Sequence, residues 1–334
     1  MKDSKIEWTD HTFNPWEGCT KVSPGCAHCY AETRNARWHG GKAPNWGPGA
    51  PRRRTSEANW QKPLRWKWEG NICDECGQKS FSDTCVHGNC EGQTRRQRVF
   101  CASLADWLDD EVPLGWLCEL LNLIRLTPSL DWQLLTKRPE NWSFRINQVG
   151  WVLDDKPDTD HCCNALRSWL ADWMFSRRPP ANVWIGTTVE DQQRADERIP
   201  TLLEIPARVR FLSCEPLLET VDLSAFIGRS CSLDDVVTPY NMGIDWVIAG
   251  GESGPGSRPM NPDWARYLRD QCAAAEVSFF FKQWGDWADG HPEGFTERAS
   301  ITEKHWPGGG ISVRCGKKAA GRLLDGRTHD EFPN

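Results

Sequence analysis

Six short apolar runs recur along the chain, each rich in β-branched and aromatic residues and each followed directly by polar residues or glycine. They comprise residues 98–103, 132–137, 183–188, 209–214, 245–251 and 277–284. Because the runs are apolar throughout and do not alternate with polar residues, they predict strands that are buried on both faces. Strands of this kind are typical of a parallel sheet covered on both sides.

Stretches with a helical pattern lie between these runs. They comprise residues 104–126, 161–175, 189–204 and 262–275. Strands and helices that alternate in this way predict βαβ units. We therefore expect an α/β fold, either a complete or partial (β/α) barrel or a doubly wound sheet.

Polar residues and glycines stand at the end of all six predicted strands. They are Ser103 and Asp106; Lys137 and Arg138; Thr187 and Glu190; Ser213 and Glu215; Gly250, Gly251 and Glu252; and Lys282. An α/β barrel builds its site from the C-terminal ends of many strands, whereas an open sheet concentrates it at one switch point. The distribution over six strands favours a barrel. Taken singly, Thr187 or Ser213 could equally be a turn or cap residue.

The charge of the chain is unevenly distributed. The 334 residues carry a formal net charge of −6, yet residues 34–70 hold nine basic and two acidic residues. Five tryptophans interleave with these cations, at positions 38, 46, 60, 66 and 68. Because bases stack on aromatic rings while arginine holds phosphates, this composition suits a nucleic acid. We expect contacts from Arg52, Arg53, Arg54, Arg95 and Arg96; alternatively, the tryptophans pack an irregular insertion and the arginines solvate it.

The cysteine content indicates metal binding. The chain has 15 cysteines, and its first residues lack the basic and apolar regions of a secretory signal. No window approaches the ~20 apolar residues of a membrane span. We therefore expect a soluble cytoplasmic protein without a membrane partner, in which thiols ligate metals in preference to forming disulfides.

Cys19, Cys26 and Cys29 form a C-x6-C-x2-C motif. A structural zinc ion would need a fourth ligand, which His28, between two of the cysteines, could not easily supply. Three thiolates suit a [4Fe-4S] cluster whose fourth iron is open to a substrate or cofactor, although four cysteines are more usual.

A second cluster has the spacing C-x2-C-x8-C-x4-C and comprises Cys73, Cys76, Cys85 and Cys90. Four thiolates at paired short spacings predict a closed tetrahedral zinc site. His87 could replace one of the last two cysteines. An auxiliary iron-sulfur centre and four unligated thiols are the alternatives.

The segment "IEWTDHTFNPWEGCTKVSPGCAHCYAE" resembles the opening of a phage- and prophage-associated family assigned to the radical S-adenosylmethionine (SAM) superfamily. "SLADWLDDEVP", "LLTKRPENW", "VWIGTTVED", "RFLSCEPLL", "DWVIAGGESGPGSRPMNPDW" and "FFFKQWG" are similar to that family in the same order. The resemblance covers nearly the whole chain outside residues 40–95 and 143–180.

This resemblance implies a partial (β/α)6 TIM-like barrel of the radical SAM type, with a [4Fe-4S] cluster held by Cys19, Cys26 and Cys29. The open iron would bind SAM, and one electron from a flavodoxin- or ferredoxin-type donor would release a 5′-deoxyadenosyl radical. The residues expected near SAM are His28, Tyr30, Ser103, Asp106, Lys137, Thr187, Ser213 and Glu215. Those expected near the substrate are Arg138, Glu190, Gly250, Gly251, Glu252 and Lys282.

Two features depart from the superfamily pattern. Six residues separate the first two cysteines where three are usual, and Gly-Gly-Glu follows the last strand but one instead of the second strand. The role of residues 250–252 is therefore open, and Ser103 and Asp106 could take the contact to the SAM amino group. A structural ion-pair network is the alternative for Lys137, Arg138 and Glu215.

We expect one barrel domain over residues 1–334. Residues 38–98 would form a basic, tryptophan-rich insertion with the zinc site, and residues 288–334 a tail that packs on the barrel. The leading hypothesis is a radical SAM enzyme that modifies or repairs a nucleic acid base. The alternatives are radical chemistry on a small molecule or peptide, and a metal-containing nucleic-acid-binding protein without SAM chemistry. A partner protein is also possible.

Overall fold

The computed structural model describes residues 4–157, 159–228, 243–292 and 302–333. The chain divides into two compact units. The first unit comprises Met1–Thr20, His39–Ile185 and Pro206–Arg208, and the second comprises Lys21–Trp38, Gly186–Ile205 and Val209–Asn334. Each unit is described by itself below.

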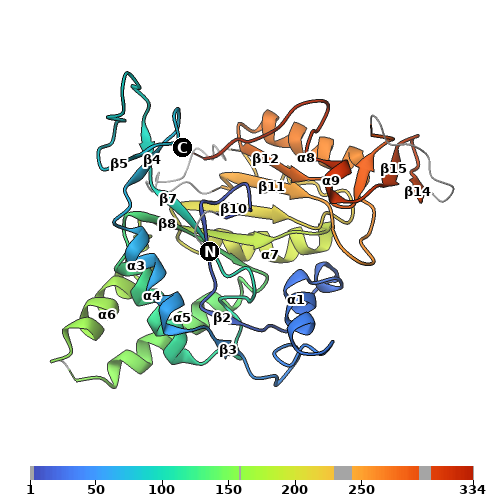
Figure 1. The fold of residues 1–334 in the computed structure, drawn as a ribbon. Helices are drawn as coiled ribbons and strands as arrows, with labels where there is room; N and C mark the ends of the chain where they lie inside the picture. Colours follow the sequence, from blue (N-terminus) through green and yellow to red (C-terminus); the bar gives the residue numbers. More distant parts are fainter. Residues whose placement is uncertain (1–3, 158, 229–242, 293–301, 334) are drawn as a thin grey trace. The chain divides into compact units, whose positions relative to one another are not determined.

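The main sheet confirms the predicted α/β class. Its strand order is β1-β7-β8-β9-β10-β11-β12, and the strands are labelled in Figure 1 where there is room. Their bounds are His11–Phe13, Gln97–Cys101, Leu130–Thr136, Val183–Thr188, Val209–Cys214, Trp246–Gly250 and Ser278–Gln283. Neighbours are parallel within the set β1, β7 and β8 of the first unit and within the set β10, β11 and β12 of the second.

The last six strands coincide with the six apolar runs, and β1 adds a seventh strand to the six expected. The boundary between the two units falls inside β9, after Ile185. Gly186, the next residue, lies so close to the ring of Phe211 on β10 that a Cβ atom would be 2.4 Å from it. Glycine at this position therefore lets the large side chain of the neighbouring strand pack.

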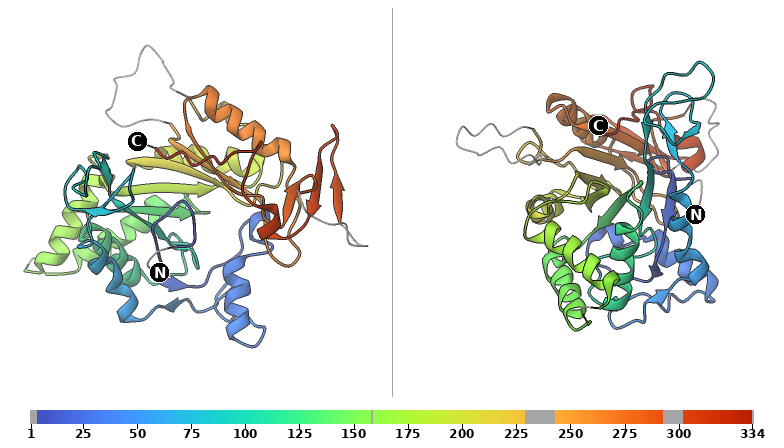
Figure 2. Two further views of the ribbon diagram at one scale, coloured as in Figure 1. Left: turned by 45° about the horizontal axis from the view of Figure 1, so that its top comes forward. Right: turned by 90° about the vertical axis from the view of Figure 1, so that its left-hand side faces the viewer.

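Four predicted helices are present. They are α4 (Leu114–Arg125), α6 (His161–Met174), α7 (Gln192–Glu204) and α8 (Pro262–Ala274). The helix expected over 104–126 begins at residue 114 because Pro113 occupies its N-cap position and residues 104–112 form turns. The longest of the helices that were not predicted are α1 (Tyr30–Trp38) and α5 (Asn141–Asp154). α8 packs on β11 and β12, as Figure 2 shows.

The segment 38–98 contains short elements. They are β3 (Arg53–Arg54), which pairs with β2 (Trp16–Glu17), helices α2 (Glu57–Trp60) and α3 (Lys62–Trp66), and strands β4 (Asn71–Cys73), β5 (Lys79–Ser80) and β6 (Thr94–Arg95). Trp66 stacks on His11 at 4.3 Å between ring centroids, and Trp60 meets Phe13 edge-on at 5.6 Å. These two tryptophans are buried in the core, as the packing alternative predicted, and cannot stack on bases.

The C-terminal segment contains the antiparallel sheet β13-β15-β14 (Trp287–Asp289, Ile311–Arg314, Glu303–His305) and helix α9 (Lys317–Ala320). Its last residues return to the main sheet. Trp246 Nε1 donates to the Glu331 carbonyl at 2.9 Å, and the Phe281 amide donates to the His329 carbonyl at 2.9 Å. The predicted tail thus contacts β11 and β12, while its residues 293–301 lie outside the described residues. None of the helices in the described ranges is long and apolar enough to cross a membrane.

Candidate functional site

The loop that carries Cys26 and Cys29 belongs to the second unit. A 3-10 turn, η1 (Pro24–Cys26), leads into it, and α1 begins directly after Cys29. The amide of Gly25 donates to Glu190 Oε1 at 3.3 Å, and a Cβ atom on Gly25 would lie only 2.9 Å from that oxygen. Glu190 follows β9, is fully buried and pairs with Arg198 at 2.9 Å. This carboxylate, which we predicted near the substrate, therefore holds the cysteine loop.

A second carboxylate fixes the same loop. His28 Nδ1 lies 2.9 Å from Glu252 Oε2, and Glu252 also accepts from Arg258 through the amide N–H at 2.8 Å and through Nη2 at 2.7 Å. Gly256, at φ 76°, passes close to the imidazole of His28. Burial opposes ionisation of Glu252, but the hydrogen bonds from Arg258 and His28 outweigh it and lower the pKa. Glu252, the Glu of Gly-Gly-Glu, thus already accepts hydrogen bonds from Arg258 and contacts His28, and His28 Nδ1 is occupied by this contact.

Cys19 belongs to the first unit and has a different environment. Arg138 Nη1 lies 3.5 Å from its Sγ, and Arg138 Nη2 donates to the Thr20 carbonyl at 2.7 Å. Burial raises the pKa of Cys19 to about 12. Because Cys19 lies in one unit and Cys26 and Cys29 in the other, the shared three-cysteine site stays a prediction.

Asp106, expected to contact SAM, is surrounded by donors of the first unit. It accepts from Thr136 Oγ1 at 2.7 Å, from the Lys137 amide at 2.8 Å and from Arg138 Nη1 at 3.0 Å. Both side chains of the Asp106–Arg138 pair are 6% exposed. The ion-pair alternative therefore describes Arg138 and Asp106, whereas the side chain of Lys137 is half-buried. Ser103, half-buried, bonds Asn14 at 3.0 Å.

The C-terminal ends of β10, β11 and β12 bring four predicted residues together. Lys282 Nζ lies 3.0 Å from Glu215 Oε1, and Ser213 Oγ donates to Glu215 Oε2 at 3.5 Å. A Cβ atom on Gly250 would be 2.6 Å from Glu215 Oε1, and one on Gly251 would be 2.0 Å from the Trp284 carbonyl oxygen. Both glycines therefore make room for neighbouring groups. The Lys282–Glu215 pair is partly exposed, at 20% and 13%, so solutes can reach it.

Two other residues expected near SAM have contrasting environments. Thr187 is fully buried within β9, whereas Tyr30, at the start of α1, is 72% exposed. A hydroxyl with no exposed surface cannot reach a bound cofactor without movement of the strand, so the SAM contact predicted for Thr187 does not agree with the structure.

The five arginines predicted to bind nucleic acid all pair with carboxylates. The pairs are Arg52–Asp109, Arg53–Glu17, Arg54–Glu119, Arg95–Asp10 and Arg96–Asp131. Arg52 is the extreme case, because its side chain has no exposed surface and also donates to backbone carbonyl groups. A phosphate cannot reach it, so we correct its assignment to a structural role. The other four are at least a quarter exposed but already carry partners.

Cys73, Cys76, Cys85 and Cys90 converge on one point. Their Sγ atoms all lie within 4.8 Å of one another, with Cys73 and Cys90 3.6 Å apart and Cys76 and Cys85 3.5 Å apart. Four sulfurs at ~2.3 Å from one tetrahedral ion would be about 3.8 Å apart, so the geometry suits a single ion. The Cys76 amide lies 3.5 Å from Cys73 Sγ and lowers the pKa of Cys73 to about 7, whereas burial and the neighbouring thiols raise the pKa of Cys85 and Cys90. This group could hold a metal.

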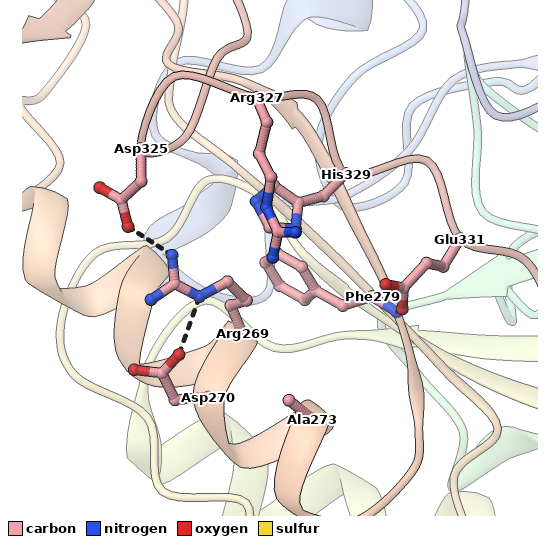
Figure 3. Close-up of a pocket in the computed structure, with 8 residues that line it drawn as sticks. All are labelled: Arg269, Asp270, Ala273, Phe279, Asp325, Arg327, His329 and Glu331. Carbon is pink, nitrogen blue, oxygen red and sulfur yellow. Dashed lines mark hydrogen bonds and ion pairs between the residues drawn. The ribbon is translucent and has the colours of Figure 1, made fainter.

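A cavity of about 420 Å³ lies in the second unit between α8, β12 and the C-terminal segment. Figure 3 shows its wall, where Arg269 bonds both Asp270 and Asp325. None of the predicted site residues lines it.

Several residues of the candidate site were not predicted from the sequence. Arg198 and Arg258, which neutralise Glu190 and Glu252, lie in a helix and a glycine-rich loop with no motif of their own. Asp109 is a further case, since its partner Arg52 is 57 residues away. For these contacts the sequence offered one indication, a cluster of arginines in an acidic chain. That cluster predicted a cationic surface, whereas in the structure several of these arginines form ion pairs.

Comparisons with known proteins give a family and distant structural similarities. A mutant of spore photoproduct lyase with dinucleoside spore photoproduct aligns over 95% of this chain and 71% of that one, with 10% identity and a TM-score of 0.38. Another, with bound AdoMet and the same ligand, aligns over 94% and 71%, with 10% identity and a TM-score of 0.35. These scores are too low to support an argument. A search of curated proteins found no match. The model of the family described as "Protein of unknown function (DUF5131)" matches residues 3–333, and the chain therefore belongs to this family.

Proposed function

We propose that the protein is a radical SAM enzyme that acts on a nucleic acid base. The observation that carries the proposal is the anchoring of the cysteine loop. Glu190, after β9, and Glu252, after β11, both bond the loop that holds Cys26 and Cys29. An iron-sulfur cluster held by this loop would lie beside the C-terminal ends of the parallel strands, where α/β enzymes build their sites. The narrower identification with the phage-associated three-cysteine family is part of this proposal.

The donor set fits a [4Fe-4S] cluster. Cys19, Cys26 and Cys29 would hold three irons, and all three cysteines are half-buried, which suits ligands at the edge of a site. The guanidinium of Arg138, 3.5 Å from Cys19 Sγ, offsets part of the effect of burial, which raises the pKa of this thiol. When bound, the cluster and SAM, with one electron from a flavodoxin- or ferredoxin-type donor, would yield methionine and a 5′-deoxyadenosyl radical that takes a hydrogen atom from the substrate.

The protein's own residues would position these groups. Lys282 offers a cation and Glu215 a carboxylate at the same strand ends, and this pair suits the carboxylate of SAM together with ribose hydroxyl groups. Ser213 would orient the carboxylate of Glu215 through its hydroxyl group. Glu252 would keep His28, and with it the loop between Cys26 and Cys29, in one position.

We also propose that Cys73, Cys76, Cys85 and Cys90 bind a structural zinc ion. Four cysteines on a [4Fe-4S] cluster each bind a different iron, so their sulfurs stand farther apart than sulfurs sharing one ion. The short distances between these Sγ atoms favour one shared ion. A zinc ion would stabilise the β4–β5–β6 sheet, which is too small to fold on its own core.

Anaerobic reconstitution tests the enzyme. The iron-loaded protein is incubated with dithionite and SAM, with and without oligonucleotides, and 5′-deoxyadenosine is measured by mass spectrometry. We expect 5′-deoxyadenosine from the wild type and none from Cys26→Ala, which lacks one proposed ligand. An intact cluster without 5′-deoxyadenosine under all these conditions would exclude the radical enzyme, and nucleic acid binding by the same sample would then favour the binding protein.

A further inference from the structure

A nucleic acid substrate needs cations and aromatic rings that are available on the surface. Arg52, Arg53 and Arg54 are engaged with carboxylates, and Arg52 is buried. Trp60 and Trp66 are buried as well. The surface that recognises the substrate must therefore be sought among the exposed cations and aromatic rings of the described residues.

Helix α1 is the blue helix labelled in Figure 1. Its two aromatic side chains are exposed to solvent. Tyr30 is 72% exposed and Trp38 is 74% exposed. Helical positions i, i+4, i+7 and i+8 share one face, which on α1 are Tyr30, Arg34, Arg37 and Trp38. Ala31 and Asn35 are the buried residues of the helix, whereas Tyr30, Arg37 and Trp38 are exposed and Arg34 is half-buried.

The charge of this face is positive. Both charged residues on it, Arg34 and Arg37, are cations, and Arg37 is exposed with no ion-pair partner in the described part of the chain. The one acidic residue of the helix, Glu32, is neutralised by Lys21 at 2.7 Å. Two exposed rings with the exposed cation of Arg37 between them match the way in which single-stranded nucleic acids are held.

We propose that the face of α1 formed by Tyr30, Arg34, Arg37 and Trp38 binds single-stranded or unstacked nucleic acid. The rings stack on bases, and Arg37 contacts a phosphate. This inference rests on the proposed function and deepens it by assigning the surface that recognises the substrate. Because α1 starts directly after Cys29, a strand bound along it lies next to the loop proposed to hold the cluster.

Fluorescence anisotropy with a fluorescein-labelled single-stranded oligonucleotide, prepared as DNA and as RNA, tests this surface on the full-length protein. We expect Trp38→Ala to weaken binding by about 5- to 150-fold, the range for loss of one stacked base. Trp68→Ala is the matched control, because Trp68 is 71% exposed but lies outside α1. This variant should bind the oligonucleotide with the affinity of the wild type. Arg37→Gln should lower the slope of log affinity against log salt by about 0.7.

The outcomes separate the two proposals. Wild-type affinity in both Trp38→Ala and Tyr30→Ala would overturn the role of α1, and would leave a protein partner as the reason for its exposed rings. No binding of either oligonucleotide by the wild type would overturn both the surface and the nucleic acid substrate, while 5′-deoxyadenosine formation would still report on SAM chemistry. The tighter of the DNA and RNA complexes identifies the kind of substrate. Since both rings are exposed, circular dichroism should show unchanged folding in every variant.

Discussion

Arg52 offers the sharpest test of the fold. It is the first of three consecutive arginines, yet its side chain has no exposed surface and its partner Asp109 is 1% exposed. Arg52 Nε donates to Asp109 Oδ2 at 2.7 Å, and Nη1 donates to the Ala50 carbonyl at 2.8 Å. Arg52→Met removes the cation while keeping much of the apolar stem, so Asp109 is left as a buried charge without its partner.

Breaking a buried ion pair on one side costs about 3–5 kcal/mol. For a folding unit of ~150–250 residues, each kcal/mol lowers Tm by about 2–4 °C, so Arg52→Met should lower Tm by about 6 °C or more. Arg53→Met is the matched control. Arg53 is 56% exposed and its partner Glu17 is 9% exposed, so removal of this solvated cation should lower Tm less than removal of the fully buried Arg52.

Thermal unfolding followed by circular dichroism measures both variants. The double variant Arg52→Met with Asp109→Leu should recover part of the lost stability, because neither charge then remains buried alone. Equal Tm values for Arg52→Met and Arg53→Met would refute the buried pair and restore Arg52 as a surface cation.

Three further predictions concern other contacts. Glu252→Gln removes the charge and places an amide NH2 group, a donor, against the donors of His28 or Arg258. Trypsin should therefore cut the metal-free protein after Lys21 about 10-fold faster or more, with the exposed Glu197→Gln as the control; an unchanged rate would contradict the anchoring of the loop. Cys76→Ser should reduce zinc, measured by mass spectrometry, from about one ion per chain to a small fraction, and wild-type protein rich in iron at this site would contradict zinc. Burial opposes ionisation of Asp10, but hydrogen bonds from Arg95 outweigh it and lower the pKa of Asp10 in the folded protein. The Asp10–Arg95 pair therefore stabilises the fold above the ordinary pKa of 3.8, and this stabilisation is lost as the pH falls through the lower pKa of the folded state. Asp10→Asn should flatten that acid limb of the stability curve, and an identical limb would contradict the pair.

The strands of the sheet could be predicted because burial on both faces leaves continuous apolar runs. Strand β1 was not predicted because it is three residues long and contains histidine and threonine. Helix α1 has an arginine-rich sequence with no apolar stripe, since only Ala31 and Asn35 are buried. Its position depends on contacts made elsewhere in the chain.

The gathering of charged groups at the strand ends could be predicted better than the pairs that these groups form. The ends of β10 and β12 do bring Glu215 and Lys282 together, as expected of strand ends in a parallel sheet. The partners of Glu252 could not be found in the same way, because His28 is 224 residues away and its contact depends on the folded geometry. Residue type and spacing thus indicated where charged groups gather, whereas pairing between distant residues decided which of them remain available to a ligand.

The most direct test of the central claim is hydrogen transfer from a nucleic acid to 5′-deoxyadenosine. Reconstituted protein is incubated with SAM, dithionite and single-stranded DNA or RNA deuterated on carbon, and the 5′-deoxyadenosine is analysed by mass spectrometry. A radical SAM enzyme acting on nucleic acid predicts deuterium in the product of the wild type and no 5′-deoxyadenosine from Cys26→Ala. Undeuterated 5′-deoxyadenosine with every oligonucleotide would contradict a nucleic acid substrate, and its complete absence would contradict the enzyme.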